Sequence, residues 1–176
     1  MTTAAVAPEP VFVDTNLLVY AAVPAFPLHV DARMRLTELE AAGVCLWISR
    51  QTLREYLSAL SRPSAYSPPI PMTSLIGDVS ALLARFQVVE DGPAVTSALL
   101  TILAAVPCGE KQVYDANTVA TMTTRSIRRL LTHNASDSVR FSTWVDILPL
   151  YNFARSEECP LSGLDPLLLP RPDWLC

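Results

Sequence analysis

The amino-acid sequence predicts an α/β fold, in which a parallel sheet is flanked by helices. Short apolar runs typical of buried strands alternate with helical segments of about ten residues or more, as in crossover connections between parallel strands. The length of 176 residues fits a single domain. Hydrophobic residues make up 51% of the chain and charged residues 17%, so we also expect apolar surface that a partner would cover.

The first predicted strand ends in an acidic residue. Residues 11–13 favour strand structure, and Asp14 follows them directly. Ligands of open α/β sheets bind at the carboxyl ends of the strands, so Asp14 is a candidate site residue. Taken alone, it would more commonly be a helix N-cap. Residues 16–23 then predict a helix that is interrupted at Pro24 and Pro27.

The second strand lies between two predicted helices. A helix is predicted over residues 29–42, and Gly43 ends it. Residues 44–48 form the strand, and Ser49 is a typical N-cap for a helix over residues 50–61. The apolar positions at helical spacing are Val30, Met34, Leu36 and Leu39 in the first helix, and Leu53, Tyr56, Leu57 and Leu60 in the second.

The pattern continues after a proline-rich loop at residues 64–71. A helix is predicted over residues 73–86 and a third strand over residues 87–89. The sequence Asp91-Gly92-Pro93 starts the next helix, with proline in its first turn. The predicted buried positions of that helix are Val95, Ala98, Leu99, Ile102, Leu103 and Val106.

The last third of the predicted domain places two more acids near element boundaries. Residues 113–120 begin a helix with Asp115 in its first turn, where a carboxylate ordinarily only stabilises the helix dipole. A fourth strand is predicted over residues 128–132, and Asp137 lies shortly after it. A fifth, shorter strand is predicted over residues 144–148.

Charge and cysteine content exclude several functions. The net charge is −4 and Lys111 is the only lysine, which argues against indiscriminate binding of nucleic acid but not against a local arginine patch. The four cysteines lack the spacing of a zinc site and fit reduced thiols. Because no run reaches the roughly 18 apolar residues of a spanning helix and the first ten residues do not resemble a secretory signal, we expect a cytoplasmic protein without membrane attachment.

Four acidic residues are more simply explained by one site than by four separate roles. They are Asp14, Glu55, Asp115 and Asp137. Three lie at one edge of the predicted sheet, and Glu55 lies on a crossover helix outside its apolar stripe. At about 5 Å, each ionised pair would repel by roughly 3 kcal/mol at an effective dielectric constant near 20. Such a cluster must take up protons or hold a cation, and oxygen ligands alone favour Mg²⁺ or Mn²⁺.

Four blocks of the sequence resemble the successive motifs of the PIN domain and, more narrowly, those of the VapC-type toxin ribonucleases. The blocks are VFVDTNLLVYA, ISRQTLREYLSALSRP, VYDANTVATM and LLTHNASDSVRF, within residues 11–150. The resemblance implies a three-layer PIN-like fold, with a parallel five-stranded sheet of order 3-2-1-4-5 flanked by helices. We assign residues 1–153 to this domain, with a flexible leader over residues 1–10, and residues 154–176 to a proline- and leucine-rich tail.

The resemblance also implies a metal-dependent endoribonuclease. A water molecule activated by Mg²⁺ or Mn²⁺ would hydrolyse single-stranded or loop RNA and leave a 5′-phosphate. The catalytic and metal-binding carboxylates would be Asp14, Glu55, Asp115 and Asp137, and the supporting polar groups would be Asn16, Asn117, Thr132 and Asn134. The candidate RNA contacts, each of which equally fits a solvated surface charge, are Arg50, Arg54, Arg62, Arg125 and Arg140.

The expected partners are an antitoxin protein and a second copy of the chain. The antitoxin is implied by the resemblance, and the apolar composition favours a homodimer. We expect a segment of the antitoxin to place a basic side chain among the acids and to lie in an apolar groove. The groove would be lined by Leu17, Leu18, Tyr20, Leu57 and Leu60. Two other functions remain open: a PIN nuclease of RNA processing without an antitoxin, and a non-catalytic module that binds RNA or protein.

Overall fold

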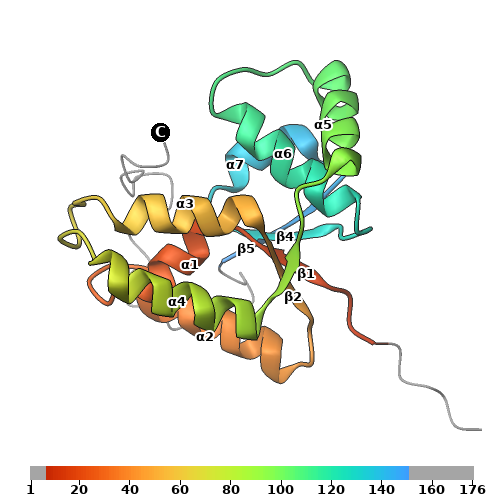
Figure 1. The fold of residues 1–176 in the computed structure, drawn as a ribbon. Helices are drawn as coiled ribbons and strands as arrows, with labels where there is room; N and C mark the ends of the chain where they lie inside the picture. The colour runs from red at the N-terminus through yellow and green to blue at the C-terminus, as the bar shows by residue number, and fades with distance from the viewer. Residues whose placement is uncertain (1–6, 151–176) are drawn as a thin grey trace, which may run out of the picture.

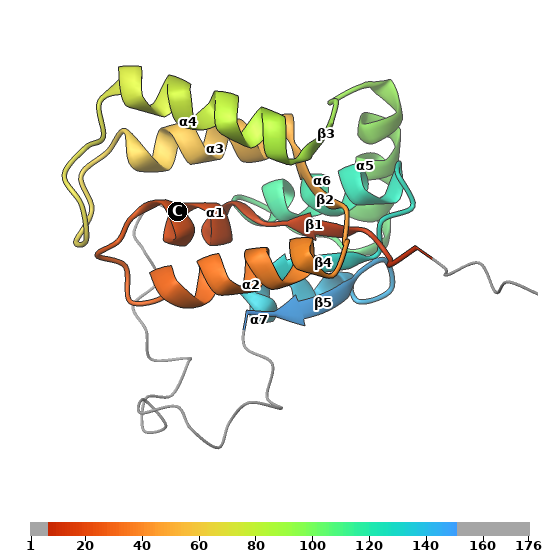
Figure 2. The ribbon, with the colours of Figure 1, turned by 90° about the horizontal axis from the view of Figure 1, so that it is seen from below.

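The structure is a computed structural model that describes residues 7–150, in which a five-stranded sheet lies between two groups of helices (Figure 1). All neighbouring strands are parallel, in the order β3-β2-β1-β4-β5, which can be followed in Figure 2. The strands are β1 (Val11–Val13), β2 (Leu46–Ser49), β3 (Gln87–Val89), β4 (Arg129–Thr132) and β5 (Asp146–Pro149). The predicted fold class and strand order are therefore confirmed.

Helices connect the strands as predicted, and their starts differ from the predicted ones by at most two residues. They are α1 (Thr15–Ala22), α2 (His29–Ala41), α3 (Arg50–Leu60), α4 (Met72–Arg85), α5 (Pro93–Ala105), α6 (Gln112–Thr123) and α7 (Ala135–Ser138). The short helix α7 was not predicted, because four residues are too few to show a helical period. Within residues 7–150, no helix is long and apolar enough to cross a membrane. The predicted tail and most of the predicted leader lie outside the described residues.

The central strand β1 contributes to two hydrophobic clusters on opposite faces of the sheet. Val11 and Val13 pack with residues of α1, α2, α3 and α4, whereas Phe12 packs with residues of α5 and α6. This division follows from the alternation of side chains along a strand. All three side chains are fully buried. The strand is therefore fixed from both faces, and Asp14 emerges at its carboxyl end.

The predicted partner groove is wrong, because its residues belong to the core. Leu17, Leu18, Tyr20 and Leu60 are at most 5% exposed, and Leu57 is partly buried against them. The physical reason is that α1 and α3 lie on the same face of the sheet and pack against each other. A partner helix cannot enter that space without unfolding part of the protein.

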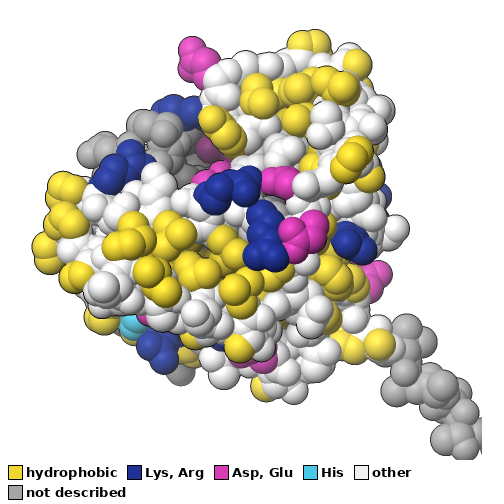
Figure 3. All heavy atoms as spheres, in the orientation of Figure 1, with side chains coloured by type: hydrophobic (Ala, Val, Ile, Leu, Met, Phe, Trp, Pro, Cys, Tyr) yellow, Lys and Arg dark blue, Asp and Glu magenta, His cyan; other side chains and the backbone are white. Residues whose placement is uncertain are grey.

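Apolar surface is exposed on α2 and α4 instead. Of the apolar positions at helical spacing in α2, Val30 and Met34 are 62% and 47% exposed, while Leu36 and Leu39 are buried. Helix α4 buries only Leu75 of its fourteen residues. Its exposed large apolar side chains are Met72, Ile76 and Leu83. Figure 3 shows hydrophobic side chains gathered on the face that carries α3 and α4.

Candidate functional site

Asp14 lies between β1 and α1, at the carboxyl edge of the sheet. By position it is the N-cap residue of α1, but other side chains also hold its carboxylate. The Oδ2 atom accepts hydrogen bonds from Thr132 Oγ1 (2.6 Å) and Asn16 Nδ2 (2.7 Å). The pKa of Asp14 is raised to about 6, chiefly because the side chain is buried. The hydrogen bond from Thr132 acts to lower this pKa, and the charge of Glu55 acts to raise it.

Asn16 and Thr132 fix the ends of β1 and β4 around this carboxylate. Both side chains are fully buried. Asn16 Nδ2 also donates to Thr132 Oγ1 (3.1 Å), and Asn16 Oδ1 accepts from the backbone N–H of His133 (3.3 Å). Thr132 Oγ1 further accepts from the backbone N–H of Asn134 (3.0 Å), so Asn134 contributes its backbone here. Because both polar atoms of the Asn16 side chain have partners, the orientation of the Asp14 carboxylate is well defined.

Glu55 is half-buried, and its carboxylate is turned towards the start of α1. Its Oε2 accepts from Thr15 Oγ1 (2.6 Å), and its Oε1 accepts from Gln51 Nε2 (2.7 Å). We did not predict roles for Thr15 or Gln51. The signals available were that Thr15 directly follows Asp14, and that Gln51 precedes Glu55 by four residues, which places both on one face of α3.

Asp115 shows that the four predicted acids share one electrostatic environment. Its pKa is raised to about 7, chiefly by burial and then by the charges of Asp14, Asp137 and Glu55, while Arg140 acts to lower it. Within residues 7–150, however, no three acidic, histidine or cysteine side chains are placed to hold one ion together. The carboxylates of Asp14 and Glu55 are hydrogen-bonded to neighbouring side chains.

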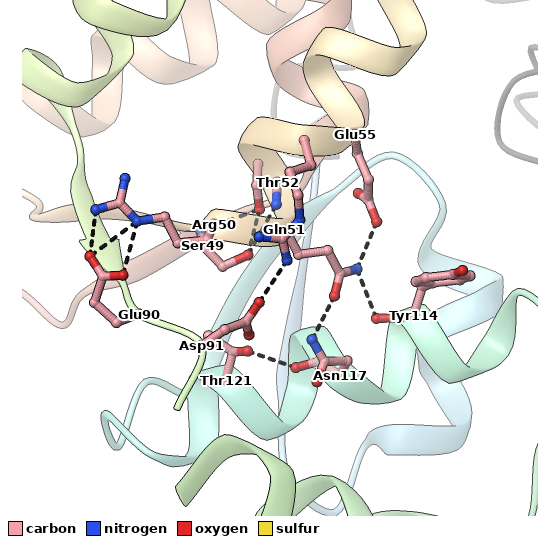
Figure 4. A network of polar contacts seen from close by, with 11 residues as sticks. Ser49, Arg50, Gln51, Thr52, Glu55, Glu90, Asp91, Tyr114, Asn117 and Thr121 are labelled. Atoms are coloured by element: carbon pink, nitrogen blue, oxygen red, sulfur yellow. Dashed lines mark hydrogen bonds and ion pairs between the residues drawn. The ribbon is translucent and has the colours of Figure 1, made fainter. Parts of the chain in front are cut away.

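Asn117 takes part in the site through Gln51, as Figure 4 shows. Asn117 Nδ2 donates to Gln51 Oε1 (2.6 Å). The same amide of Gln51 donates to Glu55 and to the backbone carbonyl of Tyr114 (3.2 Å). The polar groups that we predicted as supporting therefore act in two sets, one around Asp14 and one that reaches Glu55 from α6.

Two of the five candidate arginines are already engaged in ion pairs. Arg50 Nη2 lies 2.5 Å from Glu90 Oε1 (Figure 4). Arg54 Nη2 lies 2.7 Å from Asp91 Oδ2. Exposed pairs of this kind contribute little to stability, so a phosphate group can replace the carboxylate. The guanidinium of Arg62 donates to the backbone carbonyl of Ser58, Arg125 is exposed just beyond α6, and Arg140 acts electrostatically on Asp115.

No protein-family model matches this sequence, and no curated protein matches it. Solved structures match the fold over most of the chain. The toxin VapC20 of Mycobacterium tuberculosis, which cleaves the sarcin–ricin loop, is 18% identical with a TM-score of 0.52 over 68% of this chain and 86% of that one. A chain of VapBC2 from Rickettsia felis, bound to a fragment of its promoter DNA, is 16% identical with a TM-score of 0.58 over 80% and 98%.

A chain of VapBC-1 from nontypeable Haemophilus influenzae is 15% identical, with a TM-score of 0.59 over 81% of this chain and 98% of that one. The fold is thus PIN-like and is shared with structures of VapC toxins. At these identities, the likeness establishes the fold alone. The activity must be argued from the residues of this chain.

Proposed function

We propose that this protein is a divalent-metal-dependent endoribonuclease and the toxin of a type II toxin–antitoxin pair. The observation that carries this proposal is the shared environment of the acids, in which three carboxylates raise the pKa of Asp115. Carboxylates that repel one another at the carboxyl edge of a parallel sheet favour the binding of a cation. The likeness to the sarcin–ricin loop cleaving toxin supports RNA as the substrate.

The chemistry of the donor set fits Mg²⁺ or Mn²⁺, and binding of the ion would bring the carboxylates closer together than they lie in this structure. The ion would be held by Asp14, Glu55, Asp115 and Asp137, whose oxygen atoms are the ligands that such hard cations prefer. The hydrogen bonds to Asp14 and Glu55 resemble those that orient carboxylate ligands in metal sites. The ion would supply Lewis-acid stabilisation of the charge on the phosphodiester.

The residues of the chain itself prepare the site for that cation. Thr132 and Asn16 hold the Asp14 carboxylate in one orientation, and Thr15 and Gln51 do the same for Glu55. Because the pKa of Asp115 is about 7, cation binding near neutral pH should release a proton from its carboxyl group.

We expect the purified protein to make a few discrete cuts in loops of structured RNA. Recognition of RNA generally targets unpaired bases, and a chain of net charge −4 lacks the field to hold long duplexes. The measurement is incubation of total cellular RNA with the protein in Mg²⁺, in Mn²⁺ and in chelator, with sequencing of the ends. Cuts with 5′-phosphate ends are expected with either ion and none with chelator. Uniform laddering, ion-independent cutting or a preference for duplex DNA would contradict the proposal.

The proposal includes two protein partners, an antitoxin and a second copy of the chain. The solved structures with this fold include a toxin–antitoxin complex from Klebsiella pneumoniae and FitAB bound to DNA. We expect light scattering of the purified 19.2 kDa chain at micromolar concentration to give the mass of a dimer. Co-expression with the product of the adjacent gene should give a complex without ribonuclease activity. A monomer mass in light scattering would contradict the proposed homodimer. Full ribonuclease activity in the complex would favour a nuclease of RNA processing.

A further inference from the structure

The acids of the candidate site come from two separately packed parts of the molecule. Glu55 lies on α3, whose residues Leu53 and Tyr56 belong to the hydrophobic cluster on one face of the sheet. Asp115 lies on α6, whose residue Ala116 belongs to the cluster on the other face. The position of Glu55 relative to Asp115 is therefore not set by a shared core. It depends on the sheet on which both helices pack and on the groups that connect the two helices at the edge of that sheet.

Gln51 makes that connection with two hydrogen bonds to α6, and a third bond joins it to Glu55 on its own helix. Its side chain is 7% exposed and lies between α3 and α6 (Figure 4). The Nε2 atom donates to Glu55 Oε1 (2.7 Å) and to the backbone carbonyl of Tyr114 (3.2 Å), and the Oε1 atom accepts from Asn117 Nδ2 (2.6 Å). Rotating the amide by half a turn would place oxygen against the carboxylate and nitrogen against nitrogen. The three contacts therefore specify a single orientation of the amide.

Glu55 is consequently held from two directions. Gln51 ties one carboxylate oxygen to α6, which carries Asp115. Thr15 ties the other oxygen to the start of α1, directly after Asp14. Both bonds have an ionised acceptor, so they are stronger than bonds between neutral groups. The carboxylate of Glu55 is thus connected through Gln51 to α6, which carries Asp115, and through Thr15 to the start of α1, directly after Asp14.

We propose that Gln51 is a positioning residue that fixes Glu55 relative to α6 and thereby sets the affinity of the acidic site for a divalent cation. This inference rests on the proposed function. Groups that orient metal ligands through hydrogen bonds typically change metal affinity by about 10–100-fold when they are removed. Gln51 touches Glu55 and does not need to contact the cation itself.

The test is the melting temperature of the full chain as a function of Mn²⁺ concentration, without RNA. Gln51→Met keeps the length of the side chain and removes its donor and its acceptor. We expect the Mn²⁺ concentration that gives half of the maximal stabilisation to rise about tenfold. Asn117→Ala, which removes one of the two hydrogen bonds between the Gln51 amide and α6, should shift this midpoint in the same direction by a smaller factor.

Tyr56→Phe is the matched control. Tyr56 follows Glu55 directly in α3, and its hydroxyl donates to Asp78 Oδ2 (3.3 Å) on α4. The substitution removes this hydrogen bond, which involves none of the four acids of the site. This variant should leave the Mn²⁺ midpoint unchanged, even if it lowers the melting temperature without ion. Comparing Tyr56→Phe with Gln51→Met therefore distinguishes a general loosening of α3 from a displacement of the Glu55 carboxylate.

Each alternative outcome overturns a defined statement. If Gln51→Met lowers the ion-free melting temperature but keeps the parental Mn²⁺ midpoint, or shifts the midpoint only as much as Tyr56→Phe does, Gln51 has a structural role alone. If Gln51→Met does not fold, an unchanged midpoint for Asn117→Ala overturns the inference. If Mn²⁺ does not stabilise the parent protein, the proposed function fails and the positioning role fails with it.

Discussion

Replacing Asp115 by asparagine is expected to abolish RNA cleavage and to stabilise the ion-free protein. Asparagine keeps the shape of the side chain but removes a charge that is half-buried and repelled by Asp14, Glu55 and Asp137. Loss of a proposed metal ligand would remove several kcal/mol of transition-state stabilisation, so the rate should fall at least about a thousandfold. The free energy of unfolding should rise by about 2 kcal/mol at neutral pH, after allowance for solvent screening of a partly exposed group.

The measurements are the cleavage rate and the melting temperature in chelator and in Mn²⁺. Asp14→Asn should also abolish cleavage. Asp146→Asn is the control, because Asp146 is exposed at the start of β5 and pairs with Arg128 (3.2 Å). The control should keep both the cleavage and the stabilisation by Mn²⁺. Cleavage by Asp115→Asn at the parental rate would show that the site has been assigned to the wrong residues.

The ion-free protein is expected to lose stability as the pH rises from about 6 to about 8. The pKa values of Asp14 (about 6) and Asp115 (about 7) lie above the ordinary 3.8, so the folded state binds more protons than the unfolded state in this range. Their contribution is fully present below about pH 4 and is lost as the pH rises through 6 and 7. Burial lowers the pKa of His133, which acts in the opposite direction below about pH 6.5.

The measurement is the free energy of unfolding in urea at pH 6, 7 and 8, in chelator and in saturating Mn²⁺. A decrease of about 2 kcal/mol is expected in chelator. Mn²⁺ should largely remove this decrease, because the cation competes with protons for the carboxylates. Asp115→Asn should remove most of it as well. A free energy that is constant over this range in the parent protein would mean that the acids do not interact as described.

The sequence allowed most of the fold to be predicted, because polar residues and prolines bound the apolar runs. The strands at residues 11–13 and 87–89 have the predicted bounds. The strand expected at residues 44–48 begins instead at Leu46, the residue that pairs with Val11. Cys45 is exposed despite its apolar character, and apolarity alone does not show where a strand ladder begins.

The positions of the acids could also be predicted, but their partners could not. An acid at the carboxyl end of a parallel strand lies at a known edge of the sheet, which places Asp14 without knowledge of any contact. The partners Glu90 and Asp91 lie 40 and 37 residues from Arg50 and Arg54, a separation with no signature in the sequence. The burial of α1 on nearly every side likewise depends on its neighbours in space, and its sequence has no one-sided period that would reveal it.

The central position of β1 has a consequence for the protein as it is synthesised. Strand β1 leaves the ribosome before the other strands of the sheet. Thr132, which holds the Asp14 carboxylate, follows Asp14 by 118 residues, and Asp137 comes later still. Contacts between such distant residues form only after the intervening chain is available. A nascent chain that has reached only the end of α6 already carries Asp14, Glu55 and Asp115, but it lacks β4 and α7. Prematurely terminated products of that length therefore cannot assemble the acidic site.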